Sequence, residues 1–429
     1  MGATHFLASD FDFELPPELI AQHPAPERDQ ARLLLLNERG TAHHVFSDLP
    51  ELLLQTVGAG ALLVLNDTQV LPARLRARKL RAPGSEAALG GQVELLLCEP
   101  SPGGDGNKPR WRCLYRASKP LRPGAWLQLL ADAGAAADPA AAADPARPPP
   151  VAAGLAQVQA NEGGGYVVVE FAVASAEELL ALLTRIGEVP LPPYIHRDRP
   201  QSPGPDAQSA DRERYQTVFA KVPGSVAAPT AGLHFTPQVL AALRARGLKT
   251  ATVTLHVGPG TFSPLRSGDP REHVMHSERY HVPAATAEAI AQAKAAGRPV
   301  VAVGTTVVRT LESATLPGEQ APRPGLSATA LFIYPRGPGQ PQHRFQVVDA
   351  LLTNFHLPRS TLLMLVAAFA GRRRVLDAYA EAVRQRYRFF SFGDAMLIPR
   401  RFADPECQPV DELRPLRAEA GAGHLEELR

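Results

Sequence analysis

The sequence predicts an α/β main domain with an inserted antiparallel β-barrel-like domain. The chain has 429 residues, which is too long for one ordinary hydrophobic core. Buried-strand patterns followed by polar loops and helices occur on both sides of a central region. That region, from about 68 to 174, carries short strands with alternating polar and apolar residues. We therefore expect a discontinuous α/β catalytic domain at 1–67 and 175–400, the inserted barrel at 68–174, and a flexible tail at 401–429.

The composition sets few limits on binding partners. Lys and Arg number 45 against 43 Asp and Glu, which neither demands nor excludes a polyanion. Cys98, Cys113 and Cys407 are widely spaced and odd in number, so neither a disulfide framework nor a cysteine-based zinc site is supported. The longest apolar run, Leu362 to Ala370, is far short of a membrane span, and residues 1–14 lack a signal-peptide pattern. We expect a cytoplasmic enzyme with no membrane partner.

The first apolar runs predict buried strands of the main domain. Residues 31–37 form one run, and 61–65 form a second that leads directly into the polar residues 66–68. A short helix is predicted between them, at 46–54. Asp67 at the end of the second strand is either a turn residue or a site carboxylate, and the two interpretations are equally supported.

Short alternating segments predict the inserted barrel. On the first of them, arginines occupy one strand face and small apolar residues the other. Such charged faces are usually solvated surface, but they are also compatible with contacts to a phosphate backbone. The Ala/Pro/Gly-rich tract from Ala131 to Gly164 predicts a disordered insertion. The expected strands lie at 74–78, 93–97, 110–116, 126–130 and 165–173.

The helix that follows has a clear start and end, because Ser175 and Glu178 form a capping box and Gly187 closes the helix. Farther on, the stretch from Ala228 to Leu265 combines a loop, a helix, a strand and a glycine loop. In this stretch, Thr236 is the expected N-cap of the helix, and Gly247 is the residue at which the helix is expected to end.

The strand of that stretch, at 248–257, has one apolar face and one face of hydroxyls and imidazole. His256 therefore lies at a carboxyl end beside Gly258 and Gly260, where open α/β sheets bind ligands. The alternative is ordinary: a loop histidine such as His234 is often only a hydrogen-bonded residue, and the glycines can simply turn the chain.

Two later segments also suggest ligand contacts. His273 to His281 holds three histidines and a carboxylate, but on an extended chain they share no face, so we prefer a substrate-binding strand to a metal site. After a helix at 286–296, a strand at 299–303 passes through Gly304 directly into another helix. The N–H groups and positive dipole end of that helix suit a carboxylate or phosphate, although capping by threonine explains the same residues equally well.

The last part of the chain predicts a strand at 332–334, a polar loop at 353–360 and two helices, from Thr361 and from 372. The second helix carries Arg386 to Arg388 toward an aromatic run. Basic residues next to aromatics serve RNA loops through stacking and phosphate contacts, but they also occur at amphipathic helix ends.

Seven of these segments form an ordered set of motifs. They are Asn66–Thr68, Ala228–Phe235, His256–Phe262, His273–Tyr280, Val303–Thr306 with Arg309 and Glu312, Thr353–Pro358 with Ser360 and Thr361, and Tyr387–Phe389 with Gly393–Ile398. Each alone is weak, but together, from about Asp10 to Ile398, they resemble the S-adenosylmethionine:tRNA ribosyltransferase-isomerase family of queuosine biosynthesis. No P-loop, Rossmann glycine motif or Gly-x-Ser-x-Gly elbow points elsewhere. The departures, chiefly the insertion at 131–164 and the tail after Arg400, touch none of the motifs.

The resemblance implies that S-adenosylmethionine donates its ribosyl group rather than its methyl. The family transfers and isomerises this group onto 7-aminomethyl-7-deazaguanine at the wobble position of tRNA. Epoxyqueuosine-tRNA forms, and adenine and methionine leave. The implied partners are tRNA, through its anticodon loop, and S-adenosylmethionine as co-substrate. We expect no permanently bound cofactor, no metal, and a monomer.

The resemblance also suggests roles for individual residues. The adjacent sulfonium acidifies the 5′ hydrogens of the ribose, so a positioned base could form an ylide, and the departing adenine needs a proton. Thr305 and Thr306 would hold the methionine carboxylate, and Phe235 or Phe262 would stack on adenine. The proposed catalytic residues are His234, His256, His276, Glu278 and Asp67. The proposed substrate-binding residues are Thr230, Phe235, Gly258, Gly260, Thr261, Phe262, His273, Gly304, Thr305, Thr306, Arg309, Asn354 and His356. The proposed RNA-binding residues are Arg74, Arg76, Arg78, Arg386 and Arg388.

Two other functions remain open on the sequence. A tRNA methyltransferase would also use S-adenosylmethionine, but it would leave S-adenosylhomocysteine. A non-catalytic RNA-binding protein would use the arginine strands and the basic helix, and it would release no adenine.

Overall fold

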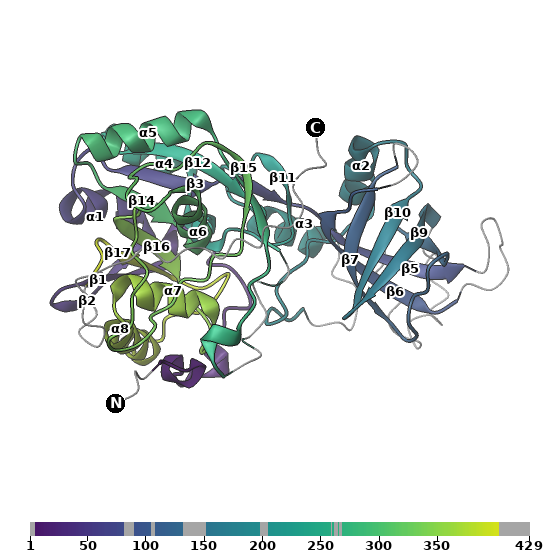
Figure 1. Cartoon of the computed structure of the whole chain (residues 1–429), viewed down its shortest axis with the longest axis horizontal. Coiled ribbons are helices and arrows are strands. Elements are labelled where there is room, and N and C mark those ends of the chain that lie inside the picture. The colour runs from purple at the N-terminus through teal and green to yellow at the C-terminus, as the bar shows by residue number, and fades with distance from the viewer. Residues whose placement is uncertain are drawn as a thin grey trace.

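The computed structural model describes residues 5–80, 90–103, 108–131, 152–197, 205–258, 260, 265 and 268–402. It has two parts: a large mixed sheet with helices on both faces, and a closed barrel, at the left and right of Figure 1. This confirms the predicted α/β main domain with an inserted antiparallel barrel. No helix in the described ranges is long and apolar enough to cross a membrane.

The main sheet positions the site because its central strands run in the same direction. In the described residues its order is β15-β13-β12-β3-β14-β16-β17-β1-β2. Neighbouring strands from β12 to β16 pair in parallel, so their carboxyl ends meet at one edge. The bounds are β1 Arg32–Asn37, β2 Gly40–Val45, β3 Leu62–Asn66, β12 Lys249–Leu255, β13 Glu278–Val282, β14 Val300–Val303, β15 Gly325–Thr329, β16 Ala350–Asn354 and β17 Ala395–Ile398.

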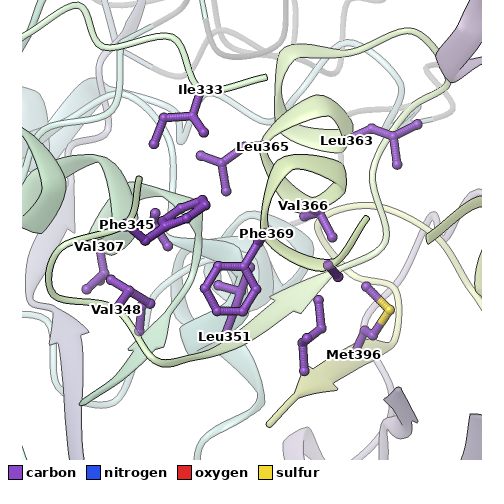
Figure 2. Close-up of a cluster of buried hydrophobic side chains, with 14 of the residues drawn as sticks. Val307, Ile333, Phe345, Val348, Leu351, Leu363, Leu365, Val366, Phe369 and Met396 are labelled. Carbon is purple, nitrogen blue, oxygen red and sulfur yellow. The ribbon is translucent and has the colours of Figure 1, made fainter. Parts of the chain in front are cut away.

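Each face of this sheet is buried under helices. Leu63 and Leu65 of β3 join the cluster beneath α1 (Leu49–Thr56) and α4 (Pro237–Ala245). Leu62 and Val64 point the opposite way, because side chains alternate along a strand. That second cluster packs against α5 (Ala284–Ala295), α6 (Thr305–Ala314), α7 (Thr361–Ala370) and α8 (Arg372–Arg384). Figure 2 shows α7 side chains such as Phe369 meeting Phe345 and Leu351 in it.

The barrel closes in the order β10-β7-β6-β5-β8-β9, with every pair antiparallel. Helix α2 (Ala176–Ile186) packs on the barrel rather than on the main sheet, because Leu179, Leu182 and Leu183 belong to the barrel's hydrophobic cluster. The boundary expected at 175 was therefore placed one helix too early. The barrel strands are β5 Arg74–Leu80, β6 Gln92–Pro100, β7 Arg110–Ala117, β8 Trp126–Leu130, β9 Ala152–Gly163 and β10 Tyr166–Phe171.

The disordered insertion predicted at 131–164 was wrong for its second part. Ala152–Gly163 is strand β9, which pairs with β8 and β10. This strand lies against α2: a Cβ on Gly154 would meet Leu182 of that helix at 3.6 Å, an ordinary van der Waals contact. Residues 132–151, and 403–429 of the predicted tail, lie outside the described residues.

Predicted caps and stops are confirmed in several helices. Thr236 accepts a hydrogen bond from the Val239 N–H at 3.2 Å, and Ser175 accepts one from Glu178. Gly247 has a φ of 76°, as a left-handed stop requires. Two predictions were wrong: 332–334 forms no strand, and α8 ends before Arg386, whose φ of 54° breaks the helix.

The remaining elements connect the two parts. A two-stranded parallel sheet pairs β4 with β11, and a helix, α3, precedes β11 in the chain. Short 3-10 turns lie mainly near the N-terminus. The bounds are β4 Thr68–Val70, β11 Val222–Ser225, α3 Pro205–Arg214, η1 Ala8–Phe11, η2 Pro17–Leu19, η3 Arg28–Gln30, η4 Phe46–Asp48, η7 Thr230–His234 and η9 Pro270–Glu272.

Candidate functional site

A pocket of about 70 Å³ lies at the carboxyl edge of the parallel strands, and we call it the sheet-edge pocket. It occupies the position where open α/β sheets bind ligands. The start of α6, the end of β16 and the loop after β16 supply most of its polar lining, and the turn η7 supplies another wall. Its lining includes Tyr194, Thr230, Val257, Gly304, Thr305, Thr306, Thr353, Asn354, His356, Ser360, Phe390 and Ser391.

One end of this pocket is the N-terminus of α6. Gly304 makes the turn from strand to helix with a φ of 95°, which favours glycine. The first N–H groups of the helix have no intrahelical acceptor, and the helix dipole adds positive potential there. Thr306 is fixed beside β3 by Asn66, whose Nδ2 donates to the Thr306 hydroxyl at 3.3 Å. This end of the pocket therefore suits a carboxylate or phosphate.

Asn354 brings an unsatisfied acceptor to the same pocket. Its side chain is 2% exposed, and its Nδ2 donates to Nε2 of His234 and to the Phe390 carbonyl, both at 3.2 Å. Its Oδ1 is buried and has no hydrogen-bond partner in the described part of the chain. Buried polar atoms are normally paired, so this oxygen is available to a donor on a ligand.

The pocket also has an aromatic wall that the sequence did not reveal. The rings of Tyr194 and Phe390 lie 4.6 Å apart, centroid to centroid. Phe390 has a φ of 72°, an unfavourable conformation for a bulky residue that is held by hydrogen bonds to Phe355 and Asn354. An aromatic run at 389–392 was the available signal, but the sequence suggested either an RNA contact or an amphipathic helix end for this region, and not a pocket wall.

His356 lines the pocket as a neutral side chain. Burial lowers the pKa of its imidazole to about 3. A hydrogen bond of 2.9 Å joins its Nε2 to the Thr353 hydroxyl. His356 therefore offers hydrogen bonding rather than charge at neutral pH.

A second cavity, of about 220 Å³, lies between the main sheet and the barrel, and we call it the interdomain groove. His256 and Gly258 line this groove, whereas Val257 between them lines the sheet-edge pocket. Alternation along an extended chain explains the division, and this signal was present in the sequence. The groove also receives His276, Ser277, Glu278 and Arg279, and, from the barrel, Cys98, Glu99, Arg112 and Tyr166.

His256 is held as a neutral base beside Asp67. Its Nδ1 is 2.8 Å from the Thr68 hydroxyl, and the Asp67 carboxylate accepts a hydrogen bond of 2.6 Å from Thr254. Burial and Arg279 lower the pKa of His256, while Asp67 opposes the shift. Gly224 leaves room for the imidazole, because a Cβ there would approach the ring to 2.7 Å. His256 can therefore accept a proton at neutral pH.

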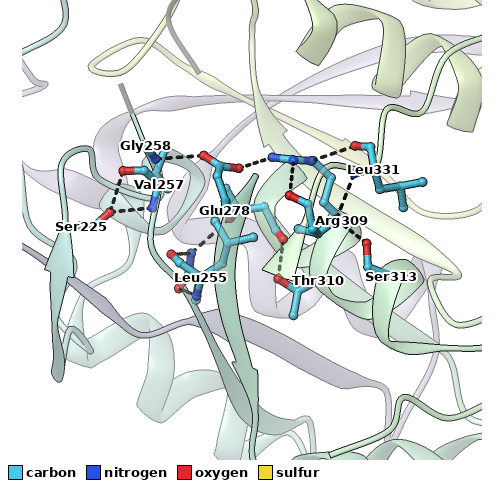
Figure 3. Close-up of polar contacts among 12 residues, drawn as sticks. Ser225, Leu255, Val257, Gly258, Glu278, Arg309, Thr310, Ser313 and Leu331 are labelled. Carbon is cyan, nitrogen blue, oxygen red and sulfur yellow. Dashed lines mark hydrogen bonds and ion pairs between the residues drawn. The ribbon is translucent and has the colours of Figure 1, made fainter. Parts of the chain in front are cut away.

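Glu278 and Arg309 form a buried ion pair, each with a side chain 5% exposed (Figure 3). Glu278 also accepts a hydrogen bond of 2.9 Å from the Gly258 N–H, and Arg309 donates to the Leu331 carbonyl at 3.1 Å. Arg309 thus faces Glu278 rather than either cavity, which argues against its predicted contact with substrate. Glu278 borders the groove, but these contacts fit a residue that positions Gly258.

Two predicted site residues of the η7 segment, His234 and Phe235, line neither of these two cavities, although His234 lines a third, smaller one. The His234 ring packs 5.1 Å from the Phe46 ring, and burial, with Arg388 and Arg28, lowers its pKa to about 3. Phe235 is fully buried between Phe46 and Phe219, so its predicted stacking on adenine was wrong. Core packing determined both positions, although the same loop brings Thr230 to the sheet-edge pocket.

Of the other predicted residues at 260–273, some are described by the structure and some are not. Gly260 lies against His276, since a Cβ there would come within 2.2 Å of the imidazole. His273 packs edge-on against Phe332 and lines neither cavity. Thr261 and Phe262 lie outside the described residues.

The described residues contain no group of three His, Cys, Asp or Glu arranged to hold a metal ion.

The predicted RNA-binding arginines lie on two different surfaces. Arg74 and Arg76 of β5 approach Glu94 and Glu188 at 3.7 and 3.3 Å, so acidic neighbours partly neutralise that strand face. Arg78 lies on the same face. Arg386 is exposed, and Arg388 is near Asp394 beside a third, smaller cavity.

Comparison with known proteins finds similarity along almost the whole chain. A family model described as queuosine biosynthesis protein matches residues 8–398. The S-adenosylmethionine:tRNA ribosyltransferase-isomerase of Anaeromyxobacter dehalogenans is 52% identical over 92% of this chain and 99% of its own length. That of Thermus thermophilus is 48% identical over 90% and 98%. A crystal structure of S-adenosylmethionine tRNA ribosyltransferase from Thermotoga maritima shows 34% identity and a TM-score of 0.46, covering 91% of this chain and 100% of that one. The chain belongs to the queuosine biosynthesis protein family.

Proposed function

We propose that this chain is an S-adenosylmethionine:tRNA ribosyltransferase-isomerase. It transfers and isomerises the ribosyl moiety of S-adenosylmethionine onto 7-aminomethyl-7-deazaguanine at the wobble position of tRNA, giving epoxyqueuosine-tRNA, adenine and methionine. The observation that carries the proposal is the identity of about half of the residues to proteins of that name across nearly their full length. S-adenosylmethionine acts as co-substrate. A tRNA substrate implies a cytoplasmic location, and we expect a monomer.

The sheet-edge pocket suits S-adenosylmethionine. We assign the methionine carboxylate to the N-terminus of α6 at Thr305 and Thr306, where N–H groups and the helix dipole favour an anion. The free Oδ1 of Asn354 suits an ammonium or amino donor on the same molecule. The Tyr194 and Phe390 wall takes the stacking role that was predicted for phenylalanines elsewhere.

His256 is the residue that we assign to proton transfer at the 5′ carbon. A carbon next to a sulfonium loses a proton more readily, and a neutral imidazole of lowered pKa is able to accept it. His256 lines the groove, and its neighbour Val257 lines the sheet-edge pocket. A ribose bound where the two cavities adjoin would therefore lie close to the His256 imidazole. The groove would then admit the modified base, with His276 at its rim.

Product analysis tests the proposal directly. The purified protein is incubated with S-adenosylmethionine and a tRNA that carries 7-aminomethyl-7-deazaguanine, and the small products are separated by chromatography. We expect adenine and methionine in equal amounts. S-adenosylhomocysteine would instead identify a methyltransferase, and unchanged S-adenosylmethionine with bound tRNA would identify a non-catalytic RNA-binding protein. An unmodified tRNA is the control and releases no adenine.

Removing the carboxylate of the co-substrate tests the role of α6. Decarboxylated S-adenosylmethionine should bind about 10- to 100-fold more weakly, because a hydrogen bond to a charged group contributes roughly 1.5–3 kcal/mol. Competition against S-adenosylmethionine in the adenine-release assay gives both affinities. Equal affinity would place the carboxylate away from the helix. The carboxamide, which keeps the size but not the charge, should lose affinity in the same way.

A further inference from the structure

The third cavity is a small hollow of about 20 Å³ where three arginines converge, and we call it the arginine pocket. Arg28 comes from η3, Arg214 from the end of α3, and Arg388 from the loop after α8. These residues are far apart in the sequence, so the fold brings three like charges together. Ser391 lines both this cavity and the sheet-edge pocket.

Neutral carbonyl groups hold two of these arginines in place. Arg28 donates to the Leu233 carbonyl at 3.0 Å and to the Glu213 carbonyl at 2.7 Å. Arg214 donates to the carbonyls of Pro26 at 2.8 Å and Ala25 at 2.5 Å. Its Nε–H is buried and has no hydrogen-bond partner within the described ranges. Carbonyl groups orient a guanidinium without neutralising its charge, so both side chains are preorganised as cations.

The neighbouring carboxylates leave a positive excess. Asp394 accepts hydrogen bonds from the backbone N–H groups of Arg32 and Arg388, and lies 3.6 Å from the Arg388 guanidinium. Glu213 is exposed. Burial and Arg214 lower the pKa of Arg28, while Glu213 opposes the shift, and burial, Arg388 and Arg28 lower the pKa of His234. The nearby carboxylates therefore offset the charge of the three arginines only in part.

We propose that the arginine pocket binds one phosphodiester group of the substrate RNA. The cavity has room for about one non-bridging oxygen, while the rest of the phosphate stays at the surface. Guanidinium groups recognise phosphate through several hydrogen bonds at once. The inference rests on the proposed function, which supplies the RNA. Because Ser391 lines both cavities, the bound phosphate would hold the RNA strand beside the sheet-edge pocket, where the ribosyl donor reacts.

Glutamine variants test the proposal, because glutamine keeps a donor for the carbonyl groups but removes the charge. Each of three variants, Arg28→Gln, Arg214→Gln and Arg388→Gln, should raise KM for tRNA on the order of 10-fold. Each should also reduce the slope of log KM against log salt concentration by about 1, the contribution of one phosphate contact. KM for S-adenosylmethionine should stay within about twofold. Arg388→Gln is the variant least able to disturb folding, since its side chain is 34% exposed. The matched control is Arg246→Gln, an exposed arginine paired with Glu51 far from the pocket.

The outcomes separate this proposal from the proposed function. If the wild-type protein releases adenine but the three variants match Arg246→Gln in KM and in salt dependence, the arginine pocket has no role in RNA binding. If the wild-type protein releases no adenine, gel-shift titrations with the same tRNA still test the pocket. Inorganic phosphate should compete with tRNA in the wild type and not in the variants. Competition by phosphate together with an unchanged KM for tRNA in the variants would identify a site for free anions and overturn the proposal.

Discussion

Replacing His256 with alanine should lower kcat by about 10²- to 10⁴-fold, the usual contribution of a positioned general base. A hydrogen bond joins Nδ1 of the imidazole to the Thr68 hydroxyl, and the Asp67 carboxylate lies nearby. The orientation of the ring is therefore fixed before substrate binds. Single-turnover release of adenine measures the effect. Binding of S-adenosylmethionine, measured by calorimetry, should change little, because His256 lies in the groove rather than in the sheet-edge pocket.

The pH profile provides an independent check on His256. Its pKa is lowered, mainly by burial and then by Arg279, so the neutral base persists below the usual pH of histidine titration, about 6.5. The rate should therefore be constant above that pH and fall as the pH drops below it. The control is His44→Ala, a partly exposed histidine beside Asp48. Near-normal turnover of His256→Ala, or an acid limb lying above pH 6.5, would contradict the assignment.

Local sequence patterns were enough to predict the sheet edge. The alternation at 248–257 identified a strand with His256 at its end, and the strand-to-helix turn at Gly304 identified the start of α6. Both signals are properties of short segments, with a period of two in strands and free N–H groups at helix starts. Parallel pairing of β12, β3, β14 and β16 then brings the segments together.

Tertiary packing decided what the sequence could not predict. Phe390 reaches the sheet-edge pocket only because its backbone is held at a positive φ by contacts with distant residues. His234 and Phe235 follow a loop of small residues that is typical of a ligand-binding site. Both rings nevertheless pack against Phe46 in the interior. Strand β9 was missed because Gly154 and its alanine neighbours resemble disorder in composition, whereas pairing with β8 and β10 on either side makes the segment a barrel strand.

The second large effect concerns the buried pair of Glu278 and Arg309. Arg309→Met should lower the free energy of unfolding by about 3–5 kcal/mol, because it leaves the Glu278 carboxylate buried without its partner cation. Turnover should also fall, since Glu278 holds the Gly258 N–H at the wall of the groove. Urea denaturation at neutral pH and adenine release measure the two effects.

Combining this change with a second one separates stability from positioning. The double variant Arg309→Met with Glu278→Leu removes both charges, and it should recover most of the lost stability because apolar residues of similar size can replace a buried ion pair. It should not recover turnover, because the Glu278→Leu change removes the carboxylate acceptor of the Gly258 N–H. Arg323→Met, which breaks the exposed pair with Glu319, is the control and should leave the free energy of unfolding almost unchanged. Full activity in the double variant would mean that the pair stabilises the fold without shaping the groove.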